Sequence, residues 1–342
     1  MSRGLTFPFA PMEALPVDEI PRGSNWQYEP KWDGFRCLAF RNKSKIELQS
    51  KAGKSLTRYF PDVVESIGAV HADNFVLDGE IVVPEGSVFS FDALLQRIHP
   101  AASRVRKLAR ETPATFIVFD LLADPEGALI HFPLTERRKR LDAFARHHFG
   151  KAKGLRLSAS TLKLSVAKNW LTRVGATLDG IIAKRSDLPY SSGNRLGMQK
   201  IKNYRSADCV VGGFRYNSGT SVVGSLLLGL YDDQGKLNHV GFTSNIPRDA
   251  KPALTKKLEK LIKPPGFTGA TPGGPSRWST ERSAQWTPLK PQLVVEVGYD
   301  HYSGDRFRHG TSLLRWRPDK APRQCTWDQV PDKGGSLLKL LR

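Results

Sequence analysis

The stretch Lys31-Trp32-Asp33-Gly34-Phe35-Arg36 (KWDGFR, residues 31–36) decides how the fold is interpreted. It lies within residues 26–40, whose short apolar and polar runs around a glycine predict strands joined by a turn. A lysine followed by Asp-Gly is common at such a turn, so the pattern alone indicates no particular chemistry. Its meaning depends on the charged residues that follow it in the chain.

Later segments place charged or aromatic residues in predicted strands. The runs at 74–84 and 114–124 are densely apolar, as in strands buried on both faces, and they carry Glu80 and Phe119. In QKIK (199–202), the two lysines share one strand face. Together with Lys31, these segments supply isolated cations, a carboxylate for a hard metal ion and an aromatic ring.

Asp179 and Lys184 lie five residues apart in DGIIAK (179–184). In a regular strand, this odd spacing sends the two side chains to opposite faces. We therefore expect both to reach one site only if a bulge or bend interrupts the strand.

The length of 342 residues predicts two domains, at roughly 100–200 residues per domain. Residues 1–205 mix strands with helices at 90–100 and 134–150, an α+β pattern. We expect Thr135 to cap the second helix and RRKR (137–140) to form its solvated face. Residues 206–342 predict short, glycine-punctuated strands and one helix, compatible with a small barrel of the OB type and with other small β folds.

The charge favours a polyanionic partner. The chain carries 52 Lys and Arg against 33 Asp and Glu, a formal charge of +19, and the excess is present in both halves. Nucleic acid is the commonest partner of such proteins. Cys37, Cys209 and Cys325 are too widely spaced for a thiolate metal cluster, and no run approaches the ~20 apolar residues of a membrane span.

Taken in order, these segments resemble the covalent nucleotidyltransferases, most closely the ATP-dependent DNA ligases of the minimal two-domain bacterial type. KWDGFR matches the nucleotidyl-lysine motif, and the other matches are QSKAGKSLTRYFPDV (49–63), VLDGEIV (76–82), FIVFDLL (116–122), DGIIAK, QKIK and RWRPDK (315–320). The family often has Glu, Arg and Trp where this chain has Asp179, Lys51 and Met198. The resemblance implies a nucleotidyltransferase (adenylation) domain over 1–205 and an OB-fold domain over 206–342.

The resemblance also implies the site. Lys31 is the catalytic nucleophile, and residues expected to bind ATP are Glu29, Lys31, Arg36, Lys51, Glu80, Phe119, Lys184, Arg195, Lys200 and Lys202. Glu80 and Asp179 would hold Mg²⁺ or Mn²⁺, with Asp33 as structural support or a further metal ligand. In the second domain, Arg317, Asp319 and Lys320 would orient pyrophosphate after a movement at a hinge over 203–207.

The residue types fit this chemistry. A lysine attacks phosphorus only when neutral, and at an ordinary pKa of about 10.4 very few molecules are neutral at pH 7. Nearby cations such as Arg36, Lys200 and Lys202 disfavour the charged form of Lys31 and also neutralise charge on the α-phosphate.

The expected activity is sealing of 3′-OH/5′-phosphate nicks in double-stranded DNA, in DNA repair. A repair polymerase as partner, a monomeric state and a cytoplasmic, nucleoid-associated location are further expectations. An RNA ligase, an mRNA-capping guanylyltransferase and a catalytically silent DNA-binding relative are the alternatives. The run 269–278 predicts either a DNA-encircling loop or a plain connector.

Overall fold

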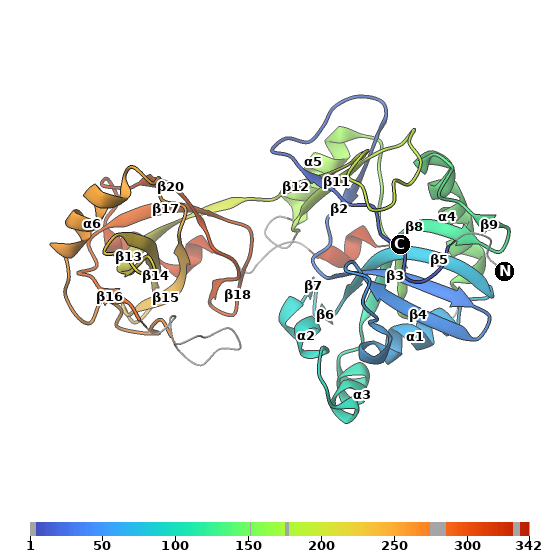
Figure 1. Cartoon of the computed structure of the whole chain (residues 1–342), viewed down its shortest axis with the longest axis horizontal. Helices are drawn as coiled ribbons and strands as arrows, with labels where there is room; N and C mark the ends of the chain where they lie inside the picture. The colour runs from blue at the N-terminus through green and yellow to red at the C-terminus, as the bar shows by residue number, and fades with distance from the viewer. Residues whose placement is uncertain (1–4, 151, 175–177, 274–284, 331–335, 342) are drawn as a thin grey trace. The chain divides into compact units, whose positions relative to one another are not determined.

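The computed structural model describes residues 5–150, 152–174, 178–273, 285–330 and 336–341 (Figure 1). It divides into two compact units, Met1–Asn203 with Lys333–Arg342, and Tyr204–Asp332. The first unit therefore ends two residues before the expected boundary at 205/206, and residues 205–207 of the expected hinge belong to a strand. Most of the 269–278 run that drew two interpretations, from 274 onward, lies outside the described residues.

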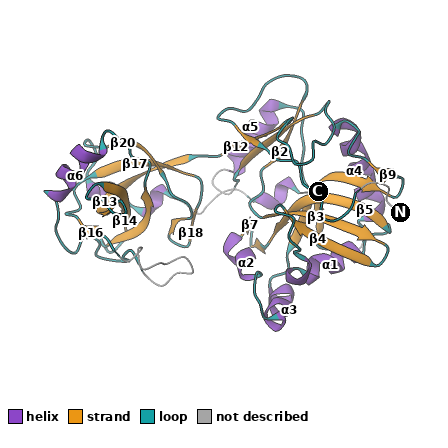
Figure 2. Cartoon of the chain, viewed as in Figure 1, coloured by secondary structure: helices purple, strands orange, loops and turns teal. Residues whose placement is uncertain are grey.

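The larger sheet of the first unit runs in the order β10-β8-β5-β3-β4, with β9 paired to β8. Its strands are β3 (Phe35–Asn42), β4 (Lys45–Ser50), β5 (Asn74–Val82), β8 (Thr115–Asp124), β9 (Gly127–Ala128) and β10 (Leu155–Leu157). Nearly every residue of β5 and β8 is buried, as their continuous apolar runs predict. In this order β5 is the middle strand, and Figure 2 shows β5, β3 and β4 side by side.

A second sheet runs in the order β1-β12-β11-β2. Its strands are β1 (Leu15–Pro16), β2 (Trp26–Pro30), β11 (Gly180–Arg185) and β12 (Met198–Lys202). The segment from Lys31 to Gly34 connects β2 of this sheet to β3 of the larger one. A Cβ on Gly34 would overlap the carbonyl oxygen of Ile81, so this connection requires glycine.

The described part of the first unit contains the helices α1 (Pro61–Gly68), α2 (Phe91–Gln96), α3 (Ala102–Glu111), α4 (Leu134–His148) and α5 (Leu164–Val174). The helix expected over 90–100 is α2, which Ser90 caps by accepting a hydrogen bond from the Ala93 amide, 3.2 Å away. The expected cap Thr135 was wrong, because α4 already begins at Leu134 with Pro133 at the N-cap position.

The expectation that RRKR (137–140) forms a solvated face was wrong for its first two residues. Arg137 and Arg138 are buried, with relative exposures of 2% and 5%. Arg137 donates two hydrogen bonds to Asp120, at 3.0 and 2.9 Å, and Arg138 donates to the Ser158 carbonyl at 2.9 Å. A buried carboxylate in β8 thus determines which face of α4 turns inward.

The last described residues also depart from the expected 206–342 domain. The 3₁₀ turn η5 (Leu337–Leu340) packs against the first unit, where Leu337 and Leu340 join a hydrophobic cluster containing Trp32 and Trp170. The Ala159 amide donates to the Leu340 carbonyl at 3.0 Å. Burial of the Leu337 and Leu340 side chains assigns this segment to the first unit, and the local sequence alone does not indicate where those side chains are buried.

The main sheet of the second unit is antiparallel and runs in the order β15-β14-β13-β17-β20, with β16 (Thr287–Pro288) paired to β13. Its strands are β13 (Arg205–Tyr216), β14 (Val223–Tyr231), β15 (Leu237–Thr243), β17 (Val294–Tyr299) and β20 (Ser312–Trp316). A parallel bridge between Thr243 and Thr311 closes the sheet on itself, and α6 (Lys251–Glu259) lies between β15 and β17. This topology confirms the predicted OB-type barrel.

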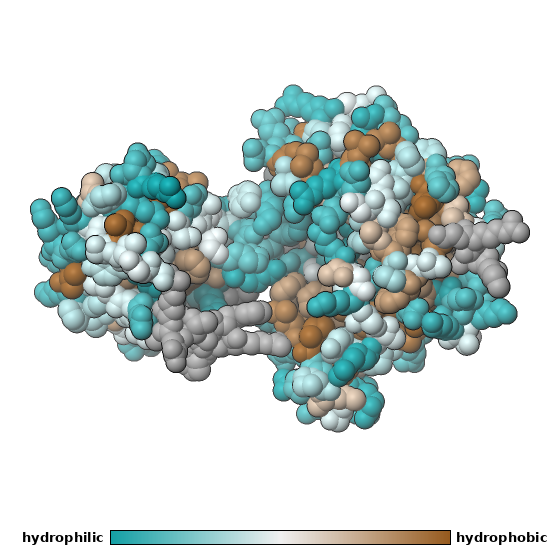
Figure 3. Space-filling model, viewed as in Figure 1, coloured by the Kyte–Doolittle hydropathy of each residue, from teal (hydrophilic) through white to brown (hydrophobic). Residues whose placement is uncertain are grey.

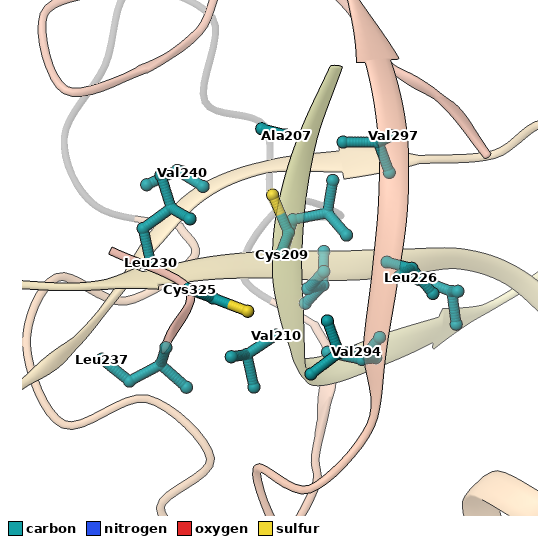
Figure 4. Packing of buried hydrophobic residues seen from close by; sticks show 14 of the residues in the cluster. Ala207, Cys209, Val210, Leu226, Leu230, Leu237, Val240, Val294, Val297 and Cys325 are labelled. Carbon is teal, nitrogen blue, oxygen red and sulfur yellow. The ribbon is translucent and has the colours of Figure 1, made fainter. Parts of the chain in front are cut away.

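The barrel core is apolar and tightly packed (Figure 4). It includes Val210, Leu226, Leu230 and Val297, all fully buried. Cys209 and Cys325 lie in the same cluster as free thiols, and burial raises the pKa of both. These cysteines therefore act as small apolar core residues.

The face shown in Figure 3 is mainly hydrophilic over both units, with apolar residues in small groups. Among the described helices, none combines the length and apolar character of a membrane span.

Candidate active site

A pocket of about 220 Å³ opens in the first unit where the two sheets meet. Residues of β2, β3, β5, β8, β11 and β12 line it, together with the segment 11–14. The lining includes Glu29, Lys31, Arg36, Lys51, Glu80, Phe119, Lys184 and Lys200. The structure thus brings together most side chains that the sequence singled out, although they come from positions 29 to 200.

Lys31 follows β2, and its amide donates to the Gly180 carbonyl at 2.9 Å. Its ammonium forms an ion pair with Asp179. Burial lowers the pKa of Lys31, and Lys202 and Lys200 lower it further against the opposing effect of Glu80 and Asp33. The geometry therefore moves this lysine toward the neutral form that a nucleophile requires.

Gly180 supplies the bend that the spacing of Asp179 and Lys184 required. Its φ is +149°, a conformation that side-chain-bearing residues rarely adopt, and a Cβ there would overlap the Ile201 carbonyl oxygen. Asp179 precedes β11 and contacts Lys31, whereas Lys184 stays in regular strand and faces the pocket.

Two cations contact the ring of Phe119 at the pocket wall. The Lys184 ammonium lies 4.4 Å and the Arg36 guanidinium carbon 4.6 Å from the ring centroid. Lys184 also pairs with Glu29 at 2.7 Å, and Gln27 donates to Glu29 at 2.8 Å. Glu29 and Lys184 are almost fully buried, so their charges compensate each other.

Asp78 is a buried site residue that the sequence interpretation missed. It accepts two hydrogen bonds from Arg36, at 2.5 and 2.6 Å, and one from the Tyr190 hydroxyl at 2.7 Å. Burial opposes the charge of Arg36, but Asp78 raises the pKa of Arg36 overall. The only sequence signal was an aspartate inside an apolar strand, which needs a partner when buried.

Glu80 is the candidate metal ligand that lines the pocket. Burial raises its pKa to about 7, although Arg36 and Lys31 oppose that shift. The carboxylates of Glu80 in the pocket and of Asp179 on Lys31 are oxygen donors of the kind that a hard divalent cation prefers. Mg²⁺ or Mn²⁺ therefore fits the donor set.

Lys51 and Arg195 meet at the pocket rim on Glu13, which the sequence interpretation also missed. Their nitrogens lie 3.2 and 3.5 Å from its Oε2. Glu13 and Lys51 line the pocket, whereas Arg195, Lys202, Asp33 and Asp179 do not. Burial lowers the pKa of Lys200, and the positive charges of Lys51 and Lys202 lower it further. Several cations are therefore gathered at the rim.

The last predicted group belongs to the second unit. Arg317 forms a bidentate pair with Asp319, with Nε–Oδ1 and Nη2–Oδ2 distances of 3.0 and 2.8 Å. The hydrogen bonds from Arg317 lower the pKa of Asp319 to about 2. Arg317 and Lys320 each also lie 2.8 Å from a carboxylate oxygen of Asp208.

Family models match most of the chain. The ATP-dependent DNA ligase domain matches residues 11–202, and the ATP-dependent DNA ligase C-terminal region matches residues 219–320. The first match covers all residues that line the pocket, and the second covers the barrel from β14 to the RWRPDK segment.

Relatives agree with this assignment. DNA ligase C2 of Mycolicibacterium smegmatis is 43% identical over 94% of both chains. The multifunctional non-homologous end joining DNA repair protein LigD of Mycobacterium tuberculosis is 28% identical over 88% of this chain and 37% of its own. A solved Lig E DNA ligase, 14% identical, shares the fold with a TM-score of 0.56, over 90% of this chain and 100% of its own. Together with the family models, these relatives show that the chain belongs to the ATP-dependent DNA ligase family.

Proposed function

We propose that this DNA ligase seals 3′-OH/5′-phosphate nicks in duplex DNA through a covalent lysyl-AMP. The lysine Nζ bonds to the α-phosphorus of ATP as the bond to pyrophosphate breaks. The AMP then passes to the 5′-phosphate of the nick, and the 3′-OH displaces it as the phosphodiester forms. The observation that carries this proposal is Lys31, with its lowered pKa, inside a cationic pocket.

We propose the remaining roles from the resemblance to the family, and for most of these residues their position in or beside the pocket supports them. Phe119 offers its ring to the adenine, Glu29 and Arg36 border the nucleoside, and Lys184, Lys200 and Lys202 stabilise charge on the phosphates. Lys51 and Arg195 hold the nucleotide more loosely from the rim. In the second unit, Arg317, Asp319 and Lys320 orient the departing pyrophosphate.

The divalent cation belongs to this proposal as well. Glu80 and Asp179 would hold it, with Asp33 as supporting residue. When bound, it would withdraw negative charge from the phosphate oxygens.

The biological setting follows from the substrate. Nicked duplex DNA and the LigD relative favour a role in DNA repair, with a repair polymerase as a candidate partner. We propose a monomer located with the bacterial nucleoid in the cytoplasm.

Labelled nucleotides test the function. Purified protein is incubated with α-labelled ATP or GTP and a divalent cation, and nicked duplex is then added. We expect label from ATP alone to join the protein and to leave it as the strand is sealed. Label from GTP would indicate capping chemistry, and sealing of nicked RNA alone would indicate an RNA ligase. Without label even after pyrophosphate treatment to remove pre-bound AMP, the proposal is wrong and a silent DNA-binding protein remains.

A further inference from the structure

Asp208, on β13 of the second unit, lies where two cations of the RWRPDK segment meet. Its Oδ1 is 2.8 Å from Arg317 Nη1, and its Oδ2 is 2.8 Å from Lys320 Nζ. The Asp208 side chain is 10% exposed, so both bonds are shielded from water. Charge-assisted hydrogen bonds of this kind are the strong ones in proteins.

The position of Asp208 is fixed by its neighbours. Its amide donates to Gln329 Oε1 at 3.1 Å, and Gln329 Nε2 donates to its carbonyl at 3.3 Å. In the sheet, Asp208 lies opposite Glu296 of β17. The Asp208 carboxylate is therefore held in position by the sheet and by Gln329, whereas Arg317 and Lys320 lie beyond the end of β20.

Within the six residues 315–320, Arg315, Arg317 and Lys320 repel one another, and nearby carboxylates compensate their charges. Arg315 pairs with Glu296 at 2.6 Å, Arg317 is shared between Asp208 and Asp319, and Lys320 lies on Asp208. Both cations thus lie within hydrogen-bond distance of one anionic group, which is also what binding of a phosphate by the two would require. The Lys320 ammonium carries three donors, and its hydrogen bond to Asp208 uses one of them.

We propose that Asp208 is a positioning residue that holds Arg317 and Lys320 ready for the phosphates that leave during lysine adenylylation. This inference rests on the proposed function of these two cations. Since pyrophosphate departs only in the first step, Asp208 should act on that step and leave phosphodiester formation unchanged.

The test compares Asp208→Asn and Asp208→Glu with the wild type and with Asp249→Asn, an exposed aspartate of the same unit. Lysyl-AMP formation is followed against ATP concentration, and sealing of nicked DNA already carrying AMP is followed without ATP. We expect Asp208→Asn to slow adenylylation about tenfold or more. In Asp208→Asn, sealing of the pre-adenylylated nick and the unfolding temperature should stay close to wild type. The control Asp249→Asn should match the wild type in both steps.

Asp208→Glu keeps the charge and should recover part of the adenylylation rate. If Asp208→Asn does not fold, the step-specific loss must still be seen in Asp208→Glu. Equal loss in both steps would mean a structural role and overturn the proposal, as would unchanged or faster adenylylation. A wild type that forms no lysyl-AMP would instead refute the proposed function, and this inference with it.

Discussion

At the scale of single residues, the pocket depends on cations whose charge is controlled by burial and by neighbouring groups. Lys31 combines a lowered pKa with an Asp179 contact, and Arg36 is held by Asp78. A pKa that is lowered for one cation and raised for its neighbour is typical of functional sites.

Lys31→Ala should abolish adenylylation, because no other lysine of the pocket lies at the end of β2 beside Asp179 among the described residues. DNA binding should persist, since one cation of a protein with charge +19 contributes little to it. Label transfer from ATP and a DNA mobility assay measure the two properties. Retained labelling would assign the nucleophile elsewhere.

Arg137→Gln should destabilise the first unit by about 3–5 kcal/mol at neutral pH, because it leaves the buried Asp120 carboxylate without its partner. Arg140→Gln, on a more exposed part of α4, should cost about 1 kcal/mol or less. Urea unfolding measures both.

The loss of stability caused by Arg137→Gln should depend on pH, and the direction of that dependence follows from Asp120. Burial alone would raise the pKa of Asp120, but Arg137 lowers it below the ordinary value of 3.8. In the wild type, Asp120 therefore contributes stability above pH 3.8 that is lost as the pH falls through its lower folded pKa. In Arg137→Gln, burial dominates, so the penalty should shrink on acidification from pH 7.5 to 5.5. An equal cost at both values would contradict this account.

At the scale of elements, the site depends on how strands begin and bend. Gly180 starts β11 with a φ of +149°, and the bend permits Asp179 to contact Lys31 while Lys184 faces the pocket.

Gly180→Ala should destabilise the protein by about 1–3 kcal/mol and slow adenylylation, because the added Cβ meets the Ile201 carbonyl and strains the backbone. Gly68→Ala is the matched control, since it lies in α1 with ordinary contact distances of 3.6 Å. That control should be neutral or slightly stabilising. Calorimetry and label transfer would detect the difference, and a neutral Gly180→Ala would show that the bend does not need glycine.

At the scale of the whole molecule, both regions that match the ligase family carry an excess of positive charge. The first unit also includes residues near the C-terminus, among them Leu337 and Leu340.

Affinity for nicked duplex should fall by about 10³–10⁵ between 50 and 200 mM salt, if about 6–10 phosphates are contacted. Self-adenylylation should change much less, because the pocket holds its charges at short range and partly buried. Titrations at several salt concentrations measure both. Parallel salt dependence of the two would argue against an extended phosphate-binding surface.

Leu337→Ala with Leu340→Ala should destabilise the first unit by several kcal/mol, at about 2–5 kcal/mol for each buried leucine. Adenylylation should fall as well, because the cluster includes Trp32, whose indole donates to Ser158 Oγ at 2.9 Å. Leu338→Ala, 43% exposed, should change stability by about 0.5 kcal/mol or less. Equal effects of the buried and exposed changes would contradict this packing.

The strand runs, the α+β character, a second domain compatible with a barrel and most of the charged residues that line the pocket could be predicted from the sequence alone. These features follow from local patterns, such as the apolar runs of β5 and β8, and from the order of motifs that the ligase family shares.

Only the tertiary structure decided which distant groups meet. Asp78 lies 112 residues from Tyr190, and Asp208 lies 109 residues from Arg317, yet each pair is hydrogen-bonded. The inward turn of Arg137 depends in the same way on Asp120. The physical reason is that a buried charge is stable only beside its partner, and the partner is set by packing rather than by neighbouring sequence.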